Sequence, residues 1–183
     1  MVALFAVMFG IFLVVFPYMQ TIIGWSALGS AAGLLPMGLT MMLMSGFAPR
    51  ISARIGSRDT MLWGIAITIA GLVTLALMAS TDGEYLQILP GLLLIGFGMG
   101  TTMTPATEAI TETLPADKQG VASALNDTSR EVGGAVGVAL LGSIVSANYG
   151  DNVAEFASTL PIELGEFVKE DYYAALGAAQ QLA

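Results

Sequence analysis

Apolar residues form five long runs along the chain, separated by short stretches that hold most of the charged residues. An α-helix rises 1.5 Å per residue, so about 20 apolar residues cross the ~30 Å hydrocarbon core of a bilayer. The runs lack the strict apolar–polar alternation of membrane barrel strands, which favours helices. The pattern predicts an all-α integral membrane protein with helical spans at residues 2–23, 27–48, 61–79, 86–110 and 121–147.

Both ends of the chain are apolar. The first run has no basic residue before it and no Ala-x-Ala cleavage pattern after it, so we interpret it as a retained span and not a signal peptide. Residues 172–183 turn apolar again and stop after about twelve residues, well short of a full span. We interpret them as the start of a truncated sixth span.

Composition supports a membrane protein and excludes several enzyme classes. Apolar residues make up 55% of the 183 and charged residues only 11%, whereas a soluble domain carries about a quarter charged residues. The chain has no cysteine and no histidine, which excludes disulfides, thiolate or histidine metal sites, cysteine nucleophiles and histidine triads. We expect no enzyme activity, no catalytic residue, no metal and no cofactor.

The energy source also follows from what the sequence lacks. Gly96, Gly98 and Gly100 lie inside a predicted span and do not follow a strand, so they do not form a phosphate-binding loop. There is no Walker motif either. An ion gradient is therefore the simpler source of energy for any work done by this chain.

The distribution of basic residues predicts the orientation. Arg50, Arg54 and Arg58 lie between the second and third spans, and Lys118 lies between the fourth and fifth. Short loops rich in lysine and arginine face the cytoplasm, so we expect these two loops to be cytoplasmic. Residues 150–171 then form an acidic extracytoplasmic loop, which accounts for most of the net charge of −8.

Polar residues and glycines recur on one face of the fourth span at spacings of 3, 4 or 7. They are Gln87, Gly91, Gly98, Thr101, Thr104, Glu108 and Glu112. Polar groups inside a membrane are costly, so this face is a candidate lining for a substrate path, with Glu108 as a candidate proton carrier. Alternatively, the helix is tightly packed and its two glutamates lie in the interface.

The fifth span carries a cluster of charged residues near its cytoplasmic boundary. Asp127, Arg130 and Glu131 are separated by 3 or 4 residues, so they share a helical face beside Asn126. One cation between two carboxylates suits a proton relay, but it equally suits an ion network that braces the helix. Asn126 is itself a candidate for the substrate path, together with Thr101, Thr104 and Gln87 of the fourth span. Gln20, in the first span, is a candidate to bind either a substrate or a neighbouring helix.

Three stretches resemble the C-terminal half of major facilitator superfamily transporters, specifically the fourteen-span drug:proton antiporters. Residues 18–26 (YMQTIIGWS) and 32–36 (AGLLP) are similar to the junction of the ninth and tenth helices. Residues 54–58 (RIGSR) resemble a cytoplasmic gating loop of the superfamily, without its aspartate. Residues 114–143 (LPADKQGVASALNDTSREVGGAVGVALLGS), preceded by PATE at 105–108, resemble the thirteenth helix and its approach.

The resemblance implies a plasma-membrane transporter that works by alternating access, in which two bundles rock about a central site. The five spans would be helices nine to thirteen, partnered by an N-terminal bundle, the lipid bilayer, a small organic substrate and protons, with no nucleic acid. It implies proton-coupled efflux of amphipathic organic compounds, with Arg54, Gly56 and Arg58 in the gating loop. The alternatives are a non-transporting membrane partner or structural bundle, or uptake of a small metabolite; a membrane-embedded enzyme fits least.

Overall fold

The computed structural model describes residues 1–80, 83–112, 115 and 118–157, and within them the ordered elements are all helices. The helices are α1 (Val2–Thr21), α2 (Ala27–Gly33), α3 (Leu35–Ile55), α4 (Ser57–Met78), α5 (Tyr85–Glu112) and α6 (Gln119–Ala157). Five helical segments are long and apolar enough to cross a membrane, with α2 and α3 together counting as one. The expected all-α membrane fold is confirmed.

The second predicted span, residues 27–48, is broken at Leu34. Pro36 has no N–H to donate to the carbonyl four residues earlier, and its ring crowds that carbonyl, so the helix cannot run through unchanged. The Leu34 N–H turns back to the Ala31 carbonyl at 3.2 Å, which ends α2. The carbonyl of Gly33, at the break, accepts a hydrogen bond from the Tyr85 hydroxyl of α5 at 2.8 Å.

Several helices extend beyond the predicted apolar spans. The helices α3 and α4 continue through the arginine-rich segment and are joined by Gly56 alone, whose φ of +88° favours glycine. The last described helix, α6, continues to Ala157, so the first part of the predicted acidic loop at 150–171 is helical. Residues 158–171, and the predicted sixth-span start at 172–183, lie outside the described residues.

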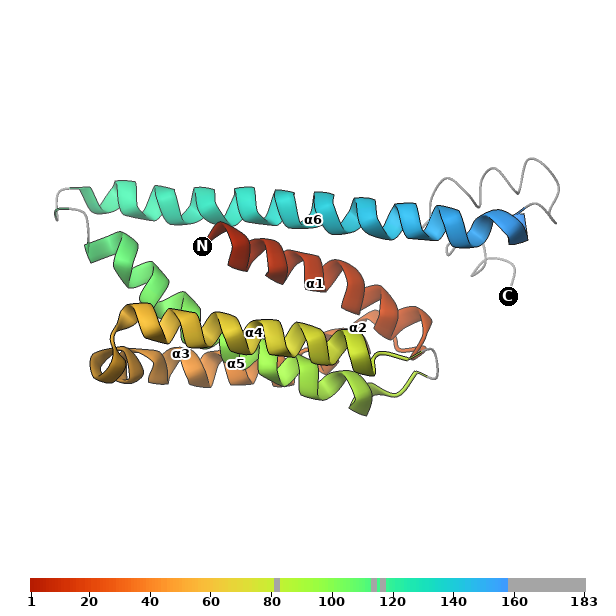
Figure 1. Cartoon of the computed structure of the whole chain (residues 1–183), viewed down its shortest axis with the longest axis horizontal. Helices are drawn as coiled ribbons and strands as arrows, with labels where there is room; N and C mark the ends of the chain where they lie inside the picture. The colour runs from red at the N-terminus through yellow and green to blue at the C-terminus, as the bar shows by residue number, and fades with distance from the viewer. Residues whose placement is uncertain (81–82, 113–114, 116–117, 158–183) are drawn as a thin grey trace.

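The helices are arranged in two layers (Figure 1). In one layer α6 packs along α1, and in the other α5 packs against both α3 and α4. A buried apolar cluster joins the layers: Ile11, Val15, Met19, Met37, Ile88, Leu92, Ile95 and Met99. The helix α5 contributes four of these side chains and is therefore the centre of the described bundle.

The glycines of α5 divide between its two neighbours. A Cβ at Gly98 would lie 2.5 Å from the Gly64 carbonyl oxygen of α4, and one at Gly100 would lie 3.0 Å from the Met41 Cα of α3. Small residues let helix backbones approach closely in a membrane, where the hydrophobic effect does not drive helices together. The glycine pattern of the sequence predicts this close packing.

Candidate functional site

A groove of about 350 Å³ lies between α3 and α5. It is lined by Met41, Ser45, Met103, Thr104, Thr107, Glu108 and Thr111. Two of these residues, Thr104 and Glu108, are candidates from the sequence. The groove therefore brings two of the sequence candidates together, and their functional role remains a prediction.

The periodicity of α5 builds one wall of the groove. Thr107 and Glu108 each lie three or four residues from both Thr104 and Thr111, which places all four on one helical face. The other wall comes from α3, where Met41 and Ser45 are also four residues apart. The close contact between α3 and α5 at Gly100 lies one turn before Thr104, so the two walls start from backbones held near each other.

Hydroxyl groups connect the two walls. The Ser45 and Thr104 hydroxyls share a hydrogen bond of 2.7 Å, and the Thr104 hydroxyl also lies 3.3 Å from the Ser45 carbonyl. Thr107 donates to the Met103 carbonyl at 2.9 Å, and Thr111 donates to the Glu108 carbonyl at 3.0 Å. The hydroxyls thus satisfy each other and the backbone at the point where the helices meet.

The Glu108 carboxyl is half-buried in this groove and lacks a counter-charge on its own helix. The helix α5 contains no lysine or arginine, and no basic residue lines the groove. An ionised carboxylate without a cation is costly in a low-dielectric setting, and binding a proton removes that cost. The groove therefore places one carboxyl group among hydroxyl groups, without a basic residue in its lining.

The charged residues of α6 lie on the surface of the described bundle. Asp127, Arg130 and Glu131 are exposed. The Arg130 guanidinium lies 5.3 Å from the centre of the Phe5 ring of α1. The Asn126 side-chain oxygen is buried without a hydrogen-bond partner. A proton-relay role for this cluster remains a prediction.

The other candidates of the substrate path do not gather in the groove. Gln20 lies near the end of α1, and Gln87 lies in the first turn of α5, far along that helix from Glu108. The Gln87 side-chain oxygen is buried without a hydrogen-bond partner. Thr101 is buried and its hydroxyl donates to the Phe97 carbonyl at 2.8 Å. Only Thr104 and Glu108 line the same groove.

The predicted gating loop is a tight connection between two helices. The Gly56 carbonyl accepts hydrogen bonds from the Thr60 amide at 3.1 Å and the Thr60 hydroxyl at 2.8 Å, which starts α4. Arg54 and Arg58 flank this glycine and are exposed. The arrangement accounts for the glycine between two arginines, and gating itself remains a prediction.

Sequence analysis missed Ser45, Thr107 and Thr111 as groove residues. Thr107 and Thr111 continue the spacing of Thr104 and Glu108, so a stricter use of helical periodicity would have found them. Ser45 comes from another helix, and its role depends on a contact that the sequence does not reveal. Within the described residues, no three acidic side chains gather closely enough to hold a metal ion.

Comparisons with a family model and with individual known proteins point to the same transporter family. The model of the Major Facilitator Superfamily matches residues 1–138. The chain is 34% identical over 153 residues to a multidrug resistance protein B homolog of Mycobacterium tuberculosis, covering 83% of the chain and 28% of that relative. It is 34% identical over 140 residues to the puromycin resistance protein pur8 of Streptomyces alboniger, covering 75% of the chain and 28% of the relative.

A third relative is the tetracenomycin C resistance and export protein of Streptomyces glaucescens, 30% identical over 142 residues, covering 78% of the chain and 26% of the relative. The chain thus spans little more than a quarter of the length of these relatives. No solved structure matches it. The family match covers four of the five membrane-crossing segments and about half of α6, so the chain belongs to the Major Facilitator Superfamily.

Proposed function

We propose that this chain forms one helical bundle of a membrane exporter that moves amphipathic organic compounds out of the cell in exchange for protons. The relatives are described as resistance or export proteins for several drugs. The observation that carries the proposal is the half-buried Glu108 carboxyl in a hydroxyl-lined groove without a counter-charge on its helix. Such a carboxyl is suited to carry a coupling proton.

The proposed mechanism is alternating access, with a second bundle contributed by the rest of the transporter. When Glu108 is protonated, the groove is neutral and is compatible with a low-dielectric, closed arrangement. When Glu108 loses its proton, the charge favours an arrangement in which water reaches the groove. The Ser45–Thr104 hydrogen bond joins α3 to α5 at this point, so a change at Glu108 acts on both helices.

The test is Glu108→Gln in a full-length transporter that carries this segment. Glutamine keeps the size and polarity of the side chain but cannot gain or lose a proton at the pH of the experiment. In inside-out vesicles, where export appears as uptake into the lumen, we expect ethidium uptake driven by an imposed pH gradient to be abolished. Equilibrium binding of ethidium to the purified transporter should stay close to that of the unmodified protein.

The matched control is Glu84→Gln, which removes an exposed carboxylate one residue before α5 begins and outside the groove. Efflux and its dependence on the pH gradient should survive this change. If Glu108→Gln also preserves both, the coupling role of Glu108 is wrong. If both variants and the parent transporter fail to move any compound while remaining folded, a non-transporting bundle is the better description.

A further inference from the structure

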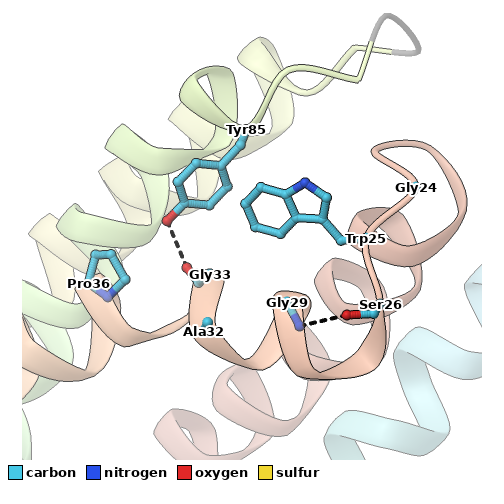
Figure 2. Close-up of a pocket in the computed structure, with 8 residues that line it drawn as sticks. All are labelled: Gly24, Trp25, Ser26, Gly29, Ala32, Gly33, Pro36 and Tyr85. Carbon is cyan, nitrogen blue, oxygen red and sulfur yellow. Dashed lines mark hydrogen bonds between the residues drawn. The ribbon is translucent and has the colours of Figure 1, made fainter.

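A second pocket lies near the start of α5, at the opposite end of that helix from the Glu108 groove. It has a volume of about 570 Å³ and is lined by Gly24, Trp25, Ser26, Gly29, Ala32, Gly33, Pro36 and Tyr85 (Figure 2). Small-molecule sites in proteins have volumes of roughly 300–1,000 Å³. The pocket is therefore large enough for a drug-sized compound, and two of its lining residues are aromatic.

The two rings are held in fixed positions. The ring centres of Trp25 and Tyr85 are 4.9 Å apart, with the planes tilted by 34°. The Tyr85 hydroxyl donates to the Gly33 carbonyl at 2.8 Å, as Figure 2 shows, and the Trp25 amide donates to the Met19 carbonyl at 3.0 Å. A Cβ at Gly33 would lie 2.7 Å from the Trp25 ring, so the absence of a side chain at Gly33 lets the indole rest on α2.

These contacts distinguish the pair from ordinary aromatic residues at a membrane surface. Tryptophan and tyrosine are common at both membrane interfaces, where they sit among lipid headgroups. Here both residues are half-buried, face each other and contact α2. The space beside them is left by small residues, namely Gly29 and Ala32, and not filled by bulky apolar side chains. The rings are thus preorganised walls of a pocket.

The charge distribution favours a cation in this pocket. None of its eight lining residues is charged. The basic residues of the described part of the chain lie toward the other end of the bundle, at the α3–α4 connection, just before α6 and in the first half of α6. They are Arg50, Arg54, Arg58, Lys118 and Arg130. The faces of aromatic rings carry negative electrostatic potential, so they attract a cation and repel an anion.

We propose that this pocket binds a hydrophobic organic monocation, whose charge lies against the Trp25 and Tyr85 rings and whose body occupies the space over Gly29 and Ala32. The proposal rests on the proposed export function in one respect, since the site would hold cationic cargo at the extracytoplasmic end of the transporter. Binding itself needs neither a proton gradient nor Glu108.

The test uses two probes of nearly the same shape and opposite charge, tetraphenylphosphonium and tetraphenylborate. Binding of each to the whole chain, purified in dodecyl maltoside, is measured by equilibrium dialysis. We expect tetraphenylphosphonium to bind more tightly than tetraphenylborate. Trp25→Leu should weaken tetraphenylphosphonium binding about tenfold, as expected for loss of a partly desolvated cation–π contact.

Trp63→Leu is the matched control, because Trp63 is the other tryptophan of the chain and lies exposed on α4 away from this pocket. It should leave the affinity unchanged. If Trp25→Leu does not fold, as judged by circular dichroism and gel filtration, Ala32→Leu gives a second test, because it fills the pocket without removing either ring. Ala32→Leu should weaken binding by a similar factor.

Three results would overturn the proposal. The first is equal affinity for both probes, and the second is normal tetraphenylphosphonium binding in the Trp25→Leu or Ala32→Leu variant. The third is displacement of the probe by phosphocholine at comparable concentration, which would assign the site to a lipid headgroup. Because the assay involves no transport, a failure here leaves the Glu108→Gln experiment unaffected, and a failure of coupling leaves this site standing.

Discussion

Two helical glycines show how strongly one substitution depends on its surroundings. A Cβ at Gly98 would lie 2.5 Å from the Gly64 carbonyl oxygen and from the Thr68 amide nitrogen, which are backbone atoms of α4. A Cβ at Gly38, in α3, would meet nothing within 4 Å. The same added methyl group therefore forces two helices apart at one position and enters open space at the other.

We expect Gly98→Ala to lower the free energy of unfolding by about 1–3 kcal/mol, because the backbone of α4 must move. Gly38→Ala should raise it by up to about 1 kcal/mol, because alanine favours the helix. Both values are measured on the purified chain in detergent by unfolding with sodium dodecyl sulfate. A destabilisation of equal size in both variants would contradict the close α4–α5 approach.

The contact between Arg130 and Phe5 allows a test at the level of a residue pair. Phe5 is 2% exposed and lies beneath the guanidinium of Arg130. In a double-mutant cycle with Phe5→Leu and Arg130→Gln, we expect a coupling of about 0.5–1 kcal/mol in the free energy of unfolding. Additive effects, with Arg130 coupled instead to Asp127→Asn or Glu131→Gln, would favour the ion network that the sequence suggests.

A local pair within α3 provides the control for this cycle. The Arg50 guanidinium lies 5.8 Å from the centre of the Phe47 ring, and both residues are exposed on the same helix. The cycle with Phe47→Leu and Arg50→Gln should give a smaller coupling, because the Phe47 ring is more exposed than the Phe5 ring and the pair does not join two helices. A larger coupling here than at Phe5 would argue against a role for Arg130 in holding α1 to α6.

At the scale of elements, apolar run length predicted the existence of all five spans but not where their helices end. A helix continues past the hydrocarbon core wherever its backbone hydrogen bonds remain satisfied, so α3 extends to Ile55 although its apolar run ends near residue 48. The break at Leu34 follows from Pro36, which the sequence displays. The Tyr85 hydrogen bond to Gly33 does not follow, because it joins residues 52 positions apart.

The candidate site, too, could be predicted from the sequence only in part. Helical spacing correctly brought Thr104 and Glu108 together, because residues four apart on one helix always share a face. Spacing could not reveal that Ser45 of α3 bonds to Thr104, nor that Arg130 lies over Phe5. Periodicity alone does not show whether Gln20 and Gln87 line a substrate path or pack against a neighbouring helix. Contacts between helices decide all of these cases.

At the scale of the whole molecule, charge is segregated along the bundle. Three of the basic residues flank the α3–α4 connection and a fourth, Lys118, precedes α6, whereas the Trp25–Tyr85 pocket is at the far ends of α1 and α5. The 22 residues of α4 connect the two ends and have a length of about 33 Å, enough to cross a bilayer. The Arg-rich end and the aromatic end should therefore face opposite compartments.

This orientation is tested with single introduced cysteines. The chain contains no cysteine of its own, so each introduced one is the only site of labelling. Ser57 begins α4 at the arginine-rich end, and Glu84 precedes α5 at the aromatic end; both are exposed. Glu84 is preferred to Gly83, where φ is +72° and a Cβ would lie 2.9 Å from the Ile22 carbonyl oxygen. Neither chosen position requires a strained backbone or the loss of a packed side chain.

We expect a membrane-impermeant maleimide to label Glu84→Cys in intact cells and to reach Ser57→Cys only in inside-out vesicles. The physical reason is that arginines and lysines in short loops are retained on the cytoplasmic side. Detergent-solubilised protein, in which both cysteines should react, is the control for accessibility. Labelling of both positions from one side would mean that α4 does not cross the membrane. Labelling with the two sides exchanged would place the Trp25–Tyr85 pocket on the cytoplasmic side, where cargo would enter the transporter and not leave it.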